Sequence, residues 1–298
     1  FSGLRVGREV GEGIVYEPLK RPLTVYDLLR HTAGLTYGVF FRSPVKGLYL
    51  EAGVDRFDLS REVFLERLAA LPLRFQPGET FEYGLATDLL GHLLEALAGR
   101  SLAELLEERL FRPLGMKDSG FQAKDPARLA QPFPKDPGTG HSLRLLPVET
   151  PPPRYAGGMG GVGTAADYLA FLEALRLGRG ALSPTMAGFM VQDHLGSLYP
   201  EALKRGPEYL PGPGYSFGLG VAVRVEPMGY SPGALGEWTW AGFGGTFFFV
   251  DPLQEITALY LAQAPNLLSV LEPEKALHSR LGARLQHAFR TLVYLGLE

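Results

Sequence analysis

Two serines stand in spacings that nucleophilic hydrolases use. Ser216 is the centre of residues 214–218 (GYSFG), a G-x-S-x-G pattern, and Ser43 begins residues 43–46 (SPVK), an S-x-x-K pattern. The first pattern needs a strand before the serine and a helix after it, and the second needs a helix that places the lysine one turn from the serine. A Pro/Gly-rich stretch precedes Ser216 and alternating apolar residues follow it, while Gly47 directly follows the lysine of the second pattern. We therefore expect Ser216 to open an ordinary strand, Ser43 to lie in a loop, and neither to be a nucleophile.

A glycine-rich stretch and the histidines could also bind ligands, but their sequence context favours structural roles. Residues 158–163 (GMGGVG) match G-x-G-x-x-G, but prolines 151–153 lie where a strand should be, and no acidic residue follows at about twenty positions. We expect a flexible glycine-rich loop that enters a helix. The six His include no pair at i, i+4, so no metal is indicated, and nothing calls for an organic cofactor. His31 falls at a helix end, where the helix dipole favours a cation and a structural role suffices.

The composition is that of a globular protein. The 298 residues are 46% hydrophobic and 20% charged, with a formal net charge of −3, which argues against disorder and against a nucleic-acid partner. No apolar run reaches the ~18 residues of a membrane span. The absence of Cys excludes disulfides, thiolate metal sites and cysteine nucleophiles. A single Asn and 22 Arg against 7 Lys fit a thermophile or a GC-rich genome.

Capping residues mark the expected helix starts. Thr24 with Asp27, and Ser101 with Glu104, form capping boxes, and Ser183 precedes a proline at the first helical position. The predicted helices cover residues 24–34, 60–71, 85–98, 101–110 and 164–177, with a further one that begins at 183. Residues 1–22 are expected to be extended or loop, and residues 122–155 to be a long loop.

The pattern changes after the Pro/Gly-rich residues 205–214. Alternating apolar residues predict a strand over 217–225, and further strands are expected at 238–240, 246–250 and 255–262. The last helix, at 273–295, should place Leu277, Leu281, Leu285, Phe289 and Leu292 on one face. This order predicts an α+β fold, with a mostly helical lobe at 1–210 and antiparallel strands plus a helix at 211–298, the two lobes forming one catalytic unit.

Several segments, in this order, resemble the serine β-lactamase-like superfamily of the class C and penicillin-binding protein type. They are residues 21–35 (RPLTVYDLLRHTAGL), 77–84 (PGETFEYG), 111–116 (FRPLGM), 157–167 (GGMGGVGTAAD), and 240–242 (WAG) with 249–252 (FVDP). Within this superfamily the chain most resembles family VIII carboxylesterases. The resemblance implies a helical lobe packed against an antiparallel sheet with flanking helices. It also implies acyl transfer through the serine of an S-x-x-K motif, with a tyrosine and the lysine as base.

The resemblance also assigns roles to residues. Tyr83 corresponds to the catalytic tyrosine of the family, and the segment assigned to substrate and oxyanion binding is Trp240, Ala241, Gly242 and Phe243, with the Phe243 N–H as half of the oxyanion hole. Many members carry Asn where this chain has Leu85, and β-lactamases carry Lys where it has Trp240. An indole does not pair with a carboxylate as an ammonium does, so these changes favour neutral acyl esters over β-lactams.

One departure from the family pattern concerns the nucleophile. The family's S-x-x-K lies several tens of residues before the segment that matches 21–35, whereas the 30 residues before His31 contain no S-x-x-K, and Ser43 follows that segment. We expect the nucleophile segment and the first strands of the fold to lie upstream of this chain, which would then be inactive alone.

The sequence thus predicts a serine hydrolase, a carboxylesterase that acts on a small ester or amide through an acyl-serine intermediate. The alternatives are a β-lactamase or D-alanyl peptidase of the same fold, and a non-catalytic binding or scaffold homologue. The oligomeric state is left open. We expect a cytoplasmic location, although a sequence that starts at Phe1 carries no information on a signal peptide.

Overall fold

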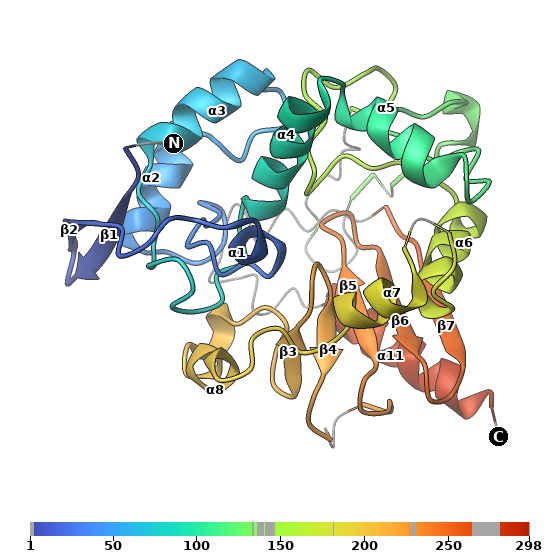
Figure 1. Cartoon of the computed structure of the whole chain (residues 1–298). Helices are drawn as coiled ribbons and strands as arrows, with labels where there is room; N and C mark the ends of the chain where they lie inside the picture. The colour runs from blue at the N-terminus through green and yellow to red at the C-terminus, as the bar shows by residue number, and fades with distance from the viewer. Residues whose placement is uncertain are drawn as a thin grey trace. The chain divides into compact units, whose positions relative to one another are not determined.

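The computed structural model describes residues 3–132, 134–135, 140, 147–180, 182–227, 231–263 and 281–297, with residues 207 and 281–285 described as backbone only. The chain divides into two compact units that alternate along the sequence (Figure 1). The first unit comprises Phe1–Leu105, Pro151–Gly160 and His194–Gly212, and the second comprises Leu106–Thr150, Gly161–Asp193 and Pro213–Glu298. The bounds of these units differ from those of the two lobes expected at 1–210 and 211–298. That the two lobes form one catalytic unit stays a prediction.

The first unit combines a small sheet with helices. Strands β1 (Arg5–Val10) and β2 (Gly13–Pro18) form an antiparallel pair. The helices are α1 (Val25–Leu29), α2 (Pro44–Ala52), α3 (Arg61–Ala70), α4 (Ala86–Ala98), α5 (Leu102–Leu106), which ends at the boundary of the unit, α8 (Leu198–Leu203) and the 3-10 turn η3 (Gly206–Glu208). Their core is aliphatic and aromatic, and it includes Leu28, Leu35, Val45, Tyr49, Phe64, Leu68, Leu73 and Leu85.

The predicted helix caps are present. Thr24 and Asp27 form a reciprocal capping box at the start of α1, and Ser101 and Glu104 make the same exchange before α5. Ser60 caps α3 by accepting a hydrogen bond from the Val63 N–H. Because each cap satisfies backbone N–H groups that have no partner inside the helix, these starts could be read from local sequence.

The second unit is built around a five-stranded antiparallel sheet in the order β3-β4-β5-β6-β7. The strands are β3 (Tyr215–Phe217), β4 (Ala222–Arg224), β5 (Trp238–Ala241), β6 (Phe247–Asp251) and β7 (Ile256–Tyr260). The helical elements are the π-helical turn η1 (Glu107–Phe111), the 3-10 turn η2 (Pro126–Arg128), α6 (Ala165–Arg176), α7 (Pro184–Met190) and α11 (Leu281–Leu295). A turn at 251–254 joins β6 to β7, with Asp251 accepting hydrogen bonds from the Leu253 and Gln254 N–H groups.

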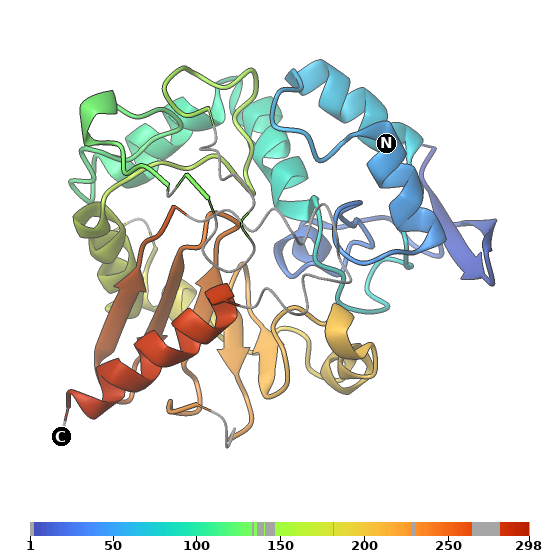
Figure 2. The ribbon, with the colours of Figure 1, turned by 180° about the vertical axis from the view of Figure 1, so that it is seen from behind.

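Helices cover both faces of this sheet. Phe248 and Val250 of β6 pack with Leu172 and Leu175 of α6, while their neighbours Phe247 and Phe249 point to the opposite face. On that opposite face lie Phe289, Val293 and Tyr294 of α11, and Figures 1 and 2 show the sheet between α6 and α11. A strand buried on both faces reads as a continuous apolar run rather than an alternation, as residues 247–250 (FFFV) do.

The expectation of one strand over 217–225 is wrong. The chain makes a tight turn after β3, in which the Gly218 N–H donates to the Val221 carbonyl at 2.8 Å. Gly220 in this turn has φ of 91°, a value that a glycine adopts readily. The apolar alternation continues through the turn, which is why the pattern concealed it.

The expected packing face of the last helix also needs correction. Residues 273–280, with Leu277, lie outside the described residues, as do the side chains of Leu281 and Leu285. Leu292 is 68% exposed, whereas Phe289 packs against Phe249 and Tyr260. The buried face therefore runs through Phe289, Val293 and Tyr294 instead of through Leu292.

Candidate functional site

Tyr83 lies in the segment that enters α4, and backbone contacts fix this segment on both sides. The Gly78 N–H donates to the Thr32 carbonyl at 2.8 Å, and the Glu82 N–H donates to the His31 carbonyl at 2.8 Å. The Tyr83 ring is half-buried and lies 4.8 Å, centroid to centroid, from the His31 ring. The two segments that carried the resemblance, 21–35 and 77–84, thus hold one another and place Tyr83.

Gly84 permits this close approach. A Cβ atom at Gly84 would lie 2.4 Å from the Leu35 carbonyl oxygen and 2.5 Å from Thr36 Cα, so no side chain fits there. The Gly84 N–H also donates to His31 Nδ1 at 3.4 Å, and Thr87 Oγ1 lies 3.2 Å from His31 Nε2. His31 therefore contacts the residue after Tyr83 and the first turn of α4.

His31 does not act as the cation that the helix dipole suggested. Its side chain is 3% exposed, and burial lowers the pKa of His31 to about 3, so the ring is neutral near pH 7. Its φ of 54° places it in the left-handed region just past the end of α1. These observations agree with the structural role expected for His31. Its neutral ring accepts a hydrogen bond from the Gly84 N–H, and its backbone turns the chain just after α1.

The S-x-x-K pattern lies at a helix start, so the loop expected around Ser43 is wrong. Ser43 is the N-cap of α2, and its Oγ accepts from the Lys46 backbone N–H at 3.4 Å. The Lys46 ammonium donates to the Phe40 carbonyl at 3.0 Å and lies 3.2 Å from Glu82 Oε1. The helix forms despite Gly47 because Val45 and Tyr49 are completely buried in the core.

The prediction for Ser216 as a strand residue is confirmed. Ser216 is the central residue of β3, is completely buried, and donates its hydroxyl hydrogen to Asp193 Oδ1. In the glycine-rich stretch 158–163, Val162 pairs with Gly120 in an isolated bridge, and Thr164 then caps α6, as predicted. Neither place has the strand-turn-helix geometry of a nucleophile elbow or of a dinucleotide loop.

The predicted oxyanion segment forms the end of β5 and the turn into β6. Trp240 pairs with Phe248 across the sheet, and its ring lies 5.2 Å from that of Phe217 in an edge-on arrangement. The turn is closed by hydrogen bonds from the Gly242 N–H to the Thr246 carbonyl and from the Gly245 N–H to the Gly242 carbonyl. Ala241 and Gly242 are exposed and Phe243 is half-buried.

The predicted site residues are divided between the two compact units. Tyr83 belongs to the first unit, and the site residues Trp240, Ala241, Gly242 and Phe243 belong to the second. That Tyr83 and these four residues act together in one catalytic unit therefore stays a prediction.

Sequence reasoning missed several charged residues around Tyr83. Glu82 is 1% exposed and is surrounded by basic side chains, among them Lys46, Arg74 and Arg205. Asp88 of α4 is also buried, in an ion pair with Arg154 at 3.1 Å. The sequence does show Lys46 in an S-x-x-K pattern and the acidic Glu82 next to Tyr83. Neither pattern indicates that these two side chains form an ion pair with one another.

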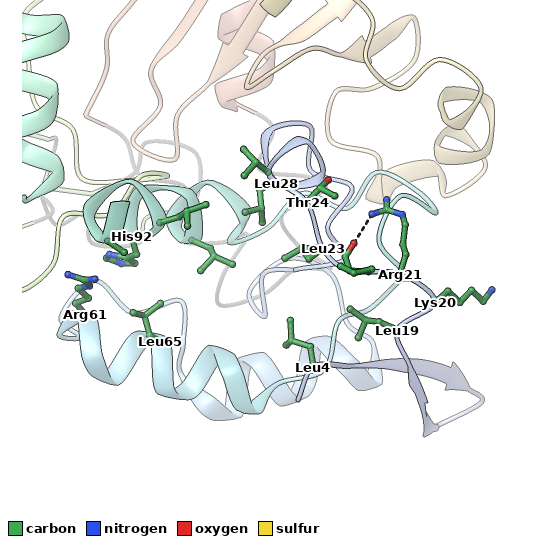
Figure 3. A pocket seen from close by; sticks show the side chains of 15 residues that line it. Leu4, Leu19, Lys20, Arg21, Leu23, Thr24, Leu28, Arg61, Leu65 and His92 are labelled. Atoms are coloured by element: carbon green, nitrogen blue, oxygen red, sulfur yellow. Dashed lines mark hydrogen bonds between the residues drawn. The ribbon is translucent and has the colours of Figure 1, made fainter. Parts of the chain in front are cut away.

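A separate apolar pocket of about 840 Å³ lies within the first unit (Figure 3). Leucines from the N-terminal segment, α1, α3 and α4 line it, and Arg61 and His92 lie at one end. His92 Nδ1 is 2.9 Å from Glu95 Oε2. None of the predicted site residues lines this pocket.

Neither a metal-binding cluster nor a membrane-spanning helix is found among the described residues. In the described ranges no group of three or more His, Cys, Asp or Glu is placed to hold a metal ion. Among the helices of the same ranges, none is both long and apolar enough to cross a membrane.

Comparison with known proteins identifies the class. The structure is similar to that of EstCE1, described as a hydrolase with promiscuous acyltransferase activity, with a TM-score of 0.70 and 30% identity over 91% of this chain and 74% of that one. This is the serine β-lactamase-like fold, with helices and an antiparallel sheet, and the predicted α+β class is confirmed. Residues 14–278 match the Beta-lactamase family, and the chain belongs to that family.

Curated relatives include two esterases. Esterase EstB of Burkholderia gladioli is 34% identical over 266 residues, which cover 82% of this chain and 65% of EstB. Lovastatin esterase of Penicillium rubens is 30% identical over 269 residues, 83% of this chain and 66% of that enzyme. The chain thus spans about two thirds of the length of these relatives, and the resemblance to esterases of this superfamily is confirmed.

Proposed function

We propose that the protein is a carboxylesterase that acts through an acyl-serine intermediate, with Tyr83 as the general base. The observation that carries the proposal is the placement of Tyr83: its half-buried ring is held between Glu82 and Gly84 and packs against the neutral His31. A general base must be held within hydrogen-bond reach of the proton it removes, and a fixed backbone on both sides of a tyrosine supports that task.

The nucleophile in this proposal is the serine of an S-x-x-K segment upstream of Phe1, as the order of motifs in the resembling family implies. The coding sequence upstream tests it directly. An open frame that encodes S-x-x-K supports the proposal, and a stop codon just before the Phe1 codon favours the alternative of a non-catalytic binding or scaffold protein.

The choice of esters over β-lactams rests on two positions. Leu85, where many members of the superfamily carry an amide, is completely buried at the start of α4 and offers no hydrogen-bonding group. Trp240 takes the place of a lysine that would pair with a carboxylate. Two relatives described as esterases support the same choice, and a β-lactamase or D-alanyl peptidase is the second candidate.

The substitution Tyr83→Phe tests the catalytic assignment in the full-length protein. Removal of a general base lowers the rate by about 10²–10⁴-fold, so kcat/KM for p-nitrophenyl butyrate should fall by at least ~100-fold. The matched control is Tyr26→Phe in the same unit, where the hydroxyl lies 2.9 Å from His194 Nδ1. Activity of Tyr83→Phe within a few-fold of the control would remove Tyr83 from the mechanism.

A further inference from the structure

The carboxylate of Glu82, the residue before Tyr83, is the centre of a buried ionic cluster. Lys46 Nζ lies 3.2 Å from its Oε1 and Arg74 Nη1 lies 3.1 Å from its Oε2. Arg205 donates to the same Oε2, and the Thr36 hydroxyl donates to Oε1 at 2.5 Å. A buried carboxylate with this many donors is held in one orientation, because each donor constrains a different lone pair or direction.

Two of the basic partners, Arg74 and Arg205, are themselves held by other acidic groups. Glu208 accepts from Arg74 at 2.6 Å and from Arg205 at 2.9 Å, and Glu9 Oε2 lies 3.4 Å from Arg74 Nη2. The three cations around Glu82 are thereby matched by three carboxylates, so burial of the group leaves no excess charge among its named members.

These contacts join parts of the first unit that are far apart in sequence. Lys46 comes from α2, Arg74 follows α3, and Arg205 follows α8. Arg205 also donates to the carbonyl of Phe81, one residue before Glu82. Glu82 and the Phe81 carbonyl, on the N-terminal side of Tyr83, are therefore tied to α2, to the segment after α3 and to the segment after α8.

The C-terminal side of Tyr83 is fixed in a different way. There, Gly84 lies against the backbone of residues 35–36, with no room for a Cβ atom. Tyr83 itself retains a half-buried ring, 5.5 Å from the ring of Tyr37. The tyrosine is thus the one partly open residue of the segment Glu82–Gly84.

We propose that Glu82 is a positioning residue, which holds the Tyr83 hydroxyl in its working orientation through the contacts with Lys46, Arg74, Arg205 and Thr36. This inference rests on the proposed role of Tyr83 as the base. It also gives a role to the lysine of the S-x-x-K pattern at 43–46: Lys46 supports the base through Glu82 and does not activate Ser43.

A purely structural role for the cluster makes a different prediction. If Glu82 only stabilised the first unit, its replacement would lower stability, and any loss of rate would be the same whether or not Tyr83 carried its hydroxyl. A residue that acts through Tyr83 loses its effect on kcat once that hydroxyl is gone, because contributions of groups that act together are not additive.

The test is a double-mutant cycle in the full-length protein with Glu82→Gln, Tyr83→Phe and the double variant, assayed on p-nitrophenyl butyrate. We expect Glu82→Gln to lower kcat by at least ~10-fold with KM changed less than about threefold, and to change kcat less than about twofold in the Tyr83→Phe background. The matched control is Glu95→Gln, another buried and ion-paired glutamate of the same unit, which should keep kcat within about twofold.

The outcomes separate this inference from the proposed function. If Tyr83→Phe alone keeps its rate, the proposed function fails and the role of Glu82 fails with it. If Tyr83→Phe is slow but Glu82→Gln keeps its rate, or if the two losses multiply, Tyr83 stays the base and the inference on Glu82 is overturned. Should Glu82→Gln not fold by circular dichroism, Thr36→Val, which removes one donor to Glu82 at nearly constant volume, goes through the same cycle with the same criteria.

Discussion

At the scale of single residues, Tyr83 depends on neighbours of three kinds. His31 supplies a neutral ring and a backbone carbonyl, Gly84 supplies close backbone contact, and Glu82 supplies a buried charge with four donors. His31 and Gly84 lie inside residues 21–35 and 77–84, the segments that carried the family resemblance. The third, Glu82, depends on partners 8 to 123 residues away in the chain, and no local pattern predicts the distant pairings with Lys46, Thr36 and Arg205.

The two serines in suggestive patterns give a prediction at this scale. We expect Ser216→Ala and Ser43→Ala each to keep kcat/KM for p-nitrophenyl butyrate within a few-fold in the full-length protein, because Ser216 is buried in β3 and Ser43 caps α2. The substitutions should lower stability by about 1–3 kcal/mol, since each removes a partner of a polar group. A loss of ~10³-fold or more in either variant would identify that serine as the nucleophile.

The buried His31 predicts a pH dependence of stability. The folded state holds the pKa of His31 at about 3, against about 6.5 in an unfolded chain, so below pH 6.5 the unfolded state binds the proton first and stability falls as the pH falls. Between pH 7.5 and pH 5.0 this one group costs about 2 kcal/mol. Asp55 acts in the opposite direction, because burial raises its pKa to about 7 and the folded state binds its proton first.

A variant isolates the contribution of His31. His31→Asn tolerates the positive φ at this position and does not titrate, so its free energy of unfolding should fall about 2 kcal/mol less than that of the parent between pH 7.5 and pH 5.0. Urea unfolding at both pH values measures the difference. Equal losses in the two proteins would mean that His31 is not held neutral.

At the scale of elements, those that depend on local contacts were predicted from the sequence, and those that depend on long-range packing were missed. The starts of α1, α5, α6 and α7 followed from capping residues because a cap is a contact within one turn. Helix α2 was missed because Gly47 lowers its intrinsic helix propensity, and its formation depends on the burial of apolar side chains against the rest of the first unit. The turn between β3 and β4 was missed because the alternation of apolar residues continued through it.

Two glycines of the first unit give a paired prediction on stability. Gly47→Ala should stabilise the protein by about 0.5–1 kcal/mol, because the residue lies inside α2 and nothing lies within 4 Å of the added Cβ. Gly84→Ala should destabilise it by more than about 2 kcal/mol, because the added Cβ meets backbone at 2.4 Å. Thermal unfolding of both variants checks the signs, and a stable Gly84→Ala protein would contradict the close packing of the Tyr83 segment.

At the scale of the whole molecule, the chain builds two compact units from alternating segments. The change from helical to strand patterns near residue 210 lies close to one unit boundary, between Gly212 and Pro213. It does not reveal the other boundaries, because segments 151–160 and 194–212 return to the first unit after the chain has entered the second. The α+β class followed from the order of patterns, whereas the grouping of segments depends on contacts that the order does not contain. The proposed substrate class belongs to this scale, since it draws on Leu85 of the first unit and Trp240 of the second.

The most direct test of the proposed function is the ratio of two efficiencies, kcat/KM for p-nitrophenyl butyrate and kcat/KM for nitrocefin, on one preparation of the full-length protein. A charge-assisted hydrogen bond contributes about 1.5–3 kcal/mol, and this chain has Trp240 and Leu85 where a lysine and an asparagine would bind a β-lactam. The lost contacts disfavour the anionic β-lactam by ~10-fold or more, while a small neutral ester loses nothing. We predict a clearly higher efficiency on the ester, and an equal or higher efficiency on nitrocefin would contradict the assignment as a carboxylesterase.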